Sequence, residues 1–213
     1  MLGANDGIVS VAAVVVGVAG ATAELSPILI AGSAAVIGGA ISMGLGEYVS
    51  VSSQRDTQRA LIAKERAELE QLPDQELEEL AGLYEAKGLS PSTARQVAAE
   101  LTEHDALAAH LEAELGITEA DVASPWQAAG ASALSFLIGA ALPMVAIIFP
   151  PADWRVPITF AAVLLALVLT GVTSARIGGA RWLRPTLRIV VGGALALAAT
   201  FLVGMLLGTT GIV

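Results

Sequence analysis

The chain has 213 residues, of which 55% are hydrophobic and 15% are charged, and its mean hydropathy is +0.72. Soluble domains carry about 25% charged residues, so this composition excludes an ordinary soluble protein. The net charge of −9 excludes a nucleic-acid partner, which needs a basic surface, and the absence of cysteine excludes disulfides and thiolate metal sites.

Five uncharged stretches are long enough to cross a bilayer as helices, a distance that takes about 20 residues. They are residues 7–23, 25–46, 126–152, 156–175 and 189–213. The sequence therefore predicts an all-α integral membrane protein with five transmembrane helices.

Acidic residues are concentrated between the second and third of these stretches. Residues 55–124 contain sixteen acidic and six basic side chains, a net charge of −10, whereas the remainder has four acidic and five basic ones, a net charge of +1. We therefore predict three parts: transmembrane helices 1 and 2 in residues 1–54, an acidic helical metal-binding insert in residues 55–124, and transmembrane helices 3 to 5 in residues 125–213.

The basic residues predict the orientation, because loops rich in Lys and Arg stay in the cytoplasm. Ten of the eleven lie in the insert or in the loop 176–188, and Arg155 alone lies on the opposite side. We expect the insert, the 176–188 loop and the N-terminus to be cytoplasmic.

Three helices are predicted in the insert. The first continues the second span to Leu72, because neither Gly nor Pro interrupts it before Pro73. A short helix follows over residues 74–87. The third begins at Ser90-Pro91, where Pro fits the first helical turn, and runs to Leu115.

Three polar or sulfur-bearing residues accompany the first two spans. Asp6 precedes the first uncharged stretch, and Met43 and Glu47 share one helical face at the end of the second. Two carboxylates and a thioether favour a transition metal over magnesium or calcium. The alternatives are that Met43 packs in the core, that Asp6 is an N-cap and that Glu47 is a charge at the membrane edge.

The insert contains three further pairs of residues that share a helix face and could bind a divalent metal. They are Glu65 with Glu68, Glu76 with Glu79, and His110 with Glu114. The alternative is a solvated acidic surface, because other acidic residues are abundant in the same helices, among them Glu70, Glu78, Glu85, Glu100, Glu103, Asp105 and Glu112.

Four segments give the chain a family resemblance: 3–10 (GANDGIVS), 42–50 (SMGLGEYVS), 64–66 (KER) and 114–117 (ELGI). With them the chain resembles the vacuolar iron transporter family over essentially its whole length. The resemblance implies a homodimer that moves Fe²⁺, and often Mn²⁺, out of the cytosol in exchange for protons, with no cofactor beyond the transported ion.

The resemblance also implies roles for particular residues. Asp6 and Met43 match positions that line the family's translocation path, and Glu47 lies close by. The glutamates of the cytoplasmic metal-binding domain fall on Glu65, Glu68, Glu76, Glu79 and Glu114. His110 departs from the family pattern, because plant members carry adjacent methionines at the positions of His110 and Leu111.

We therefore expect a transporter rather than an enzyme. The expected substrate is Fe²⁺, which it exports, and Mn²⁺ is a second candidate. The Ala-rich composition and the preference for Arg over Lys indicate a bacterial plasma membrane; for a eukaryotic chain, the vacuolar membrane is the alternative. The alternative function is a membrane-anchored protein that binds or buffers iron without transporting it. A di-iron oxidase is disfavoured, because the paired Glu-x-x-His motifs of that class are absent.

Overall fold

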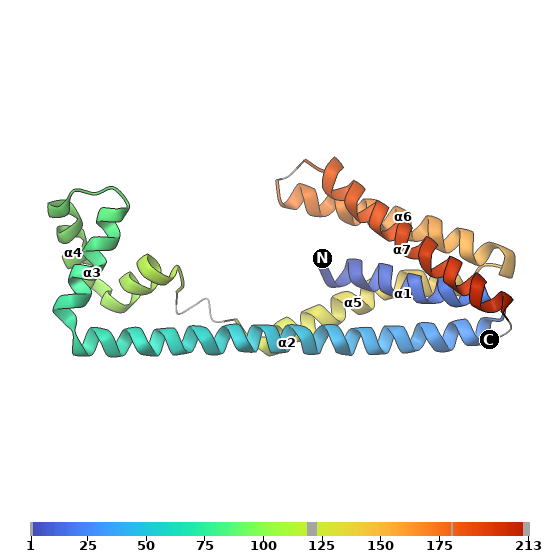
Figure 1. Cartoon of the computed structure of the whole chain (residues 1–213), viewed down its shortest axis with the longest axis horizontal. Helices are drawn as coiled ribbons and strands as arrows, with labels where there is room; N and C mark the ends of the chain where they lie inside the picture. Colours follow the sequence, from blue (N-terminus) through green and yellow to red (C-terminus); the bar gives the residue numbers. More distant parts are fainter. Residues whose placement is uncertain (1, 119–122, 180, 211–213) are drawn as a thin grey trace. The chain divides into compact units, whose positions relative to one another are not determined.

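The structure is a computed structural model that describes residues 2–118, 123–179 and 181–210, and every regular element in them is a helix (Figure 1). Five of these helices are long and apolar enough to cross a membrane. They are α1 (Leu2–Ala21), α2 (Leu25–Gln71), α5 (Pro125–Ile148), α6 (Ala152–Ile177) and α7 (Leu183–Thr209). The predicted all-α membrane fold is confirmed.

The chain divides into two compact units. The membrane unit consists of Met1–Tyr48 and Trp126–Val213, and the insert unit of Val49–Pro125. Helix α2 contributes to both, because its 47 residues extend over about 70 Å, more than twice the hydrocarbon thickness of about 30 Å. Its uncharged part ends at Gly46, so the membrane-spanning segment of α2 is residues 25–46.

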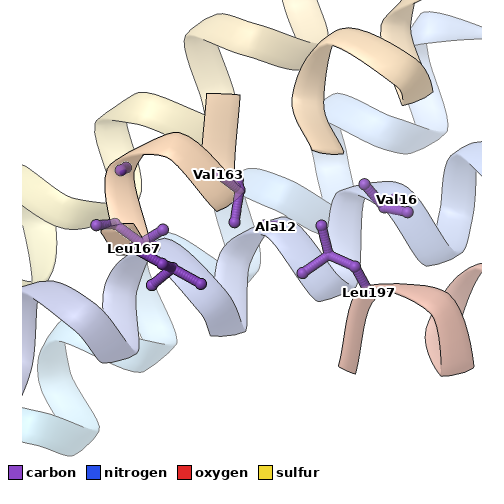
Figure 2. Packing of buried hydrophobic residues seen from close by; sticks show 7 residues of the cluster. Ala12, Val16, Val163, Leu167 and Leu197 are labelled. Atoms are coloured by element: carbon purple, nitrogen blue, oxygen red, sulfur yellow. The ribbon is translucent and has the colours of Figure 1, made fainter. Parts of the chain in front are cut away.

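Helix α1 contributes to two different clusters of buried apolar residues, because two neighbouring faces of it are buried. One face packs against α6 and α7, as Figure 2 shows. The residues of this cluster include Ala12, Val16, Val163, Leu167 and Leu197. The other face packs against α2 and α5, through Val11, Val15, Ile28, Phe136 and Ile147.

Glycines bring the backbones of α1 and α7 into contact. A Cβ atom on Gly204 would overlap the carbonyl oxygen of Gly17, and one on Gly208 would lie 2.7 Å from the carbonyl oxygen of Ala21. Small residues allow such close packing between membrane helices. The Gly204-x-x-x-Gly208 pattern is therefore used within one chain.

The insert unit adds α3 (Pro73–Ala86), α4 (Pro91–His110) and the π-helical turn η1 (Leu111–Leu115) to the second half of α2. Leu80, Ala81 and Ala98 form its buried apolar cluster. An ion pair between Arg95 and Glu78 also joins α4 to α3.

The third helix of the insert differs from the continuous helix that the sequence predicted. Asp105 has an extended backbone (φ −161°, ψ 91°), which breaks α4 before its last turn. The Asp105 side chain accepts a hydrogen bond from the Ala108 N–H at 3.0 Å, so it caps the helical segment that follows. That segment passes into η1 and ends at Gly116, which has a left-handed backbone (φ +62°).

Candidate functional site

Three ionisable side chains meet in the interior of the insert unit, each from a different helix. Glu65 comes from α2, Glu76 from α3 and His110 from the end of α4, and their exposed fractions are 3%, 6% and 0%. One potential ligand atom of each lies within 4.8 Å of those of the other two. We call this group the buried triad.

The contacts within the buried triad leave polar atoms unsatisfied. His110 Nδ1 lies 3.0 Å from Glu65 Oε1 and 3.6 Å from Glu76 Oε2. Although they are close, His110 Nδ1 and Glu65 Oε1 do not form a hydrogen bond with each other or with any other group. His110 Nε2 has no hydrogen-bond partner either. Buried polar atoms without partners are costly. A divalent cation bound between two carboxylates and an imidazole would remove that cost, and this ligand set suits a first-row transition metal.

The surroundings of the buried triad favour the protonated form of its carboxylates. Burial raises the pKa of Glu65 from 4.5 to about 7, and the negative charges of Glu114, Glu76 and Glu68 and a hydrogen bond with Glu114 act in the same direction. Burial also raises the pKa of Glu76, assisted by the charge of Glu79 and opposed by that of His110. A cation that entered this group at neutral pH would therefore displace protons.

The other predicted ligands of the insert lie around this group with more exposed side chains. Glu68 is half-buried and accepts a hydrogen bond from Lys64 Nζ at 2.7 Å, whereas Glu79 and Glu114 are exposed. The structure therefore brings Glu65, Glu76 and His110 together as one buried set.

The membrane unit contains a cavity of about 320 Å³ bounded by α1, α2 and α5. Its lining includes Met43 and Glu47 from α2, Gly3 from α1, and Ser132 and Ser135 from α5. Met43 is half-buried and Glu47 is exposed. A thioether and a carboxylate thus border the same cavity, and we call it the membrane cavity.

Asp6 does not line the membrane cavity. It lies one turn after Gly3 in α1, its side chain is exposed, and Ser10 Oγ donates a hydrogen bond to Asp6 Oδ1 at 2.8 Å. Because α1 begins at Leu2, Asp6 is inside the helix, and the alternative interpretation as an N-cap is wrong. That Asp6, Met43 and Glu47 form one path stays a prediction.

Sequence reasoning missed Ser132 and Ser135. Their three-residue spacing in an otherwise apolar stretch places them on one face of α5, which is the signal that could have identified them. It also missed Asp105, because an aspartate in an acidic helix does not stand out as a cap.

The fold and these two sets of residues define a class. The chain is a multi-pass α-helical membrane protein in which Met43 and Glu47 border a cavity between membrane-spanning helices, and Glu65, Glu76 and His110 meet in the interior of the insert unit.

Comparison with known proteins specifies the class further. The profile of the VIT family matches residues 1–205. The "Vacuolar iron transporter" of Acanthamoeba castellanii is 42% identical over 213 residues, which are 100% of this chain and 78% of that protein. "Vacuolar iron transporter homolog 1" of Oryza sativa subsp. japonica is 38% identical, over 100% of this chain and 74% of the relative. The chain belongs to the VIT family, as its resemblance predicted.

Proposed function

We propose that this protein is a transporter that exports Fe²⁺, with Mn²⁺ as a second substrate, from the cytosol in exchange for protons. The observation that carries the proposal is the membrane cavity, where Met43 and Glu47 lie together among membrane-spanning helices. Relatives of the chain are named as iron transporters, which supports iron as the cargo. A transport role also implies that the protein is not an enzyme.

Export of a doubly charged cation needs an energy source. Moving Fe²⁺ against a negative-inside potential costs about 4.6 kcal/mol per 100 mV, twice the value for a single charge. An open channel would carry the ion inward. Carboxylates that bind either protons or the metal couple the two flows, since each ion displaces the other. Asp6 and Glu47 are the carboxylates that we assign to this exchange.

The insert unit would bind the cation on the cytosolic side. The positions of ten of the eleven basic residues favour a cytoplasmic insert. The buried triad has the ligand types for Fe²⁺ or Mn²⁺. We propose that the protein acts as a homodimer in a bacterial plasma membrane.

A second candidate function is iron binding or buffering without transport. The buried triad favours it, because ligands enclosed in the insert interior suit the retention of an ion. In this case the membrane unit would serve as an anchor, and the membrane cavity would be dispensable.

Sealed vesicles that contain the purified protein distinguish the two functions. Under a transport mechanism, radiolabelled Fe²⁺ accumulates far beyond the amount of protein, resists an external chelator and is released when the vesicles are permeabilised. Under a buffering mechanism, uptake saturates near the number of binding sites. Parallel experiments with Mn²⁺, Zn²⁺ and Ca²⁺ determine the selectivity.

A further inference from the structure

The junction of α6 and α7 carries four arginines. Arg176 lies in the last turn of α6, Arg181 between the helices, and Arg184 and Arg188 in the first two turns of α7. All four side chains are exposed. Residues 154–213 contain no Asp or Glu, and among the described parts of the chain no ion pair neutralises any of the four.

An apolar stripe begins at the same end of α7. Leu183, Leu187, Val191 and Leu195 are each between 46% and 65% exposed, and their spacing of four residues places them on one face of the helix. Because α7 is a membrane-spanning helix, this face is suited to lipid tails. The exposed Trp182, just before the stripe, is of the residue type that gathers at the membrane–water interface.

The arginines of α7 lie beside the apolar stripe. Arg184 and Arg188 each follow a leucine of the stripe by one position, which is about 100° around the helix. A phospholipid whose tails lie along the leucines therefore has its phosphate near two guanidinium groups. Guanidinium binds phosphate through paired hydrogen bonds, and basic residues at the membrane surface attract anionic lipids.

We propose that Arg181, Arg184 and Arg188, with Arg176 beside them, form a binding surface for the headgroups of anionic phospholipids in the surrounding leaflet. The apolar stripe favours a lipid over free phosphate, because only a lipid contacts both the arginines and the apolar stripe. This surface lies apart from the membrane cavity and the buried triad in its residues, so the inference does not depend on the proposed transport function.

The test measures the unfolding temperature of the full-length protein in detergent. Added phosphatidylglycerol raises it, whereas phosphatidylcholine at the same mole ratio and inorganic phosphate do not. The double variant Arg184→Gln/Arg188→Gln loses most of this increase. The control Arg59→Gln/Lys87→Gln removes two positive charges from exposed positions of the insert unit, and it keeps the increase.

Salt provides a second measurement that needs no variant. Raising the ionic strength from about 0.1 M to about 1 M shortens the screening length from about 10 Å to about 3 Å, so the effect of phosphatidylglycerol on the wild-type protein should largely disappear. Three outcomes would overturn the proposal: an equal effect of phosphatidylcholine, an equal effect of inorganic phosphate, or an undiminished effect in the Arg184→Gln/Arg188→Gln variant. In the last case the arginines only orient the chain in the membrane.

Discussion

The insert unit and the membrane unit place their candidate ligands in opposite surroundings. In the insert, Glu65, Glu76 and His110 are almost fully buried, and several of their polar atoms lack partners. In the membrane unit, Glu47 and Asp6 are exposed, and Met43 is half-buried beside a cavity. One set of ligands is enclosed within a single chain, and the other is open.

This difference separates binding from passage. Enclosed ligands hold an ion tightly, because release of the ion leaves buried polar atoms without partners, which is costly. An ion in transit must both enter and leave, which an open cavity permits. We therefore expect changes in the membrane unit to act mainly on flux and changes in the insert to act mainly on affinity.

The largest expected effect is the loss of transport in Met43→Ala or Asp6→Ala. Each change removes a ligand from the proposed path, so Fe²⁺ flux into vesicles should fall to the level of protein-free vesicles while the protein remains folded. Met205→Ala is the matched control, since Met205 is an exposed methionine on α7 and should transport normally. Normal flux in both path variants would show that the path lies elsewhere.

The next effect concerns metal affinity. His110→Ala removes the imidazole of the buried triad and should weaken Fe²⁺ or Co²⁺ binding about tenfold or more, equivalent to about 1.4 kcal/mol. Anaerobic equilibrium dialysis measures it. His104 is an exposed histidine in the same helix, so His104→Ala should bind as the wild type does. Equal affinities of the two variants would contradict the triad as a metal site.

Packing of the membrane unit gives an effect on stability. A Cβ on Gly204 would overlap the carbonyl oxygen of Gly17, and overpacking of this kind costs about 1–3 kcal/mol. Gly204→Ala should therefore lower the unfolding temperature in detergent. Gly192 lies in the same helix with no atom within 4 Å of an added Cβ, and Gly192→Ala should cause no such loss. Equal stability of the two variants would mean that α1 and α7 are less closely packed.

The insert should also become less stable as pH rises. The pKa of Glu65 is raised from 4.5 to about 7 in the folded protein, so the stabilisation is complete below about pH 4.5 and is lost as pH rises through about 7. Without metal, hydrogen-exchange protection of the insert, corrected for intrinsic rates, should fall over this range. Glu65→Gln should weaken the dependence and leave the part that comes from Glu76, whereas Glu70→Gln, at an exposed position, should preserve it in full. A pH-independent wild type would contradict the buried, proton-binding state of Glu65.

The smallest expected effect is that of the cap at Asp105. Asp105→Ala removes the acceptor of the Ala108 N–H bond and should cost about 1 kcal/mol, with a weaker metal affinity because His110 follows one turn later. Asp105→Asn keeps a capping oxygen and should restore both properties. Unchanged affinity in Asp105→Ala would show that the break in α4 does not position His110.

Much of the fold follows from local features of the sequence. Uncharged stretches identify the five spans, and the absence of Gly and Pro from residues 47–72 predicts that α2 continues beyond its membrane-spanning part. The break at Asp105 could not be predicted in this way, because an aspartate in the middle of a helical pattern is compatible with either a solvated side chain or a cap.

The candidate site was predictable only as a set of residues. Helical spacing pairs Glu65 with Glu68 and Glu76 with Glu79, but it does not determine which member of each pair turns inward. That choice depends on the packing of α2, α3 and α4, which buries Glu65 and Glu76 and leaves Glu79 exposed. The contribution of Ser132 and Ser135 to the membrane cavity likewise depends on how α5 packs against α1 and α2.

The most direct test of cation–proton exchange follows both ions at once in sealed vesicles that contain the wild-type protein and an internal pH-sensitive dye. An acidic interior should drive Fe²⁺ inward, and the interior should become more alkaline in step with the metal that enters. Metal that binds without entering, or that enters with no change in internal pH, would contradict the exchange mechanism.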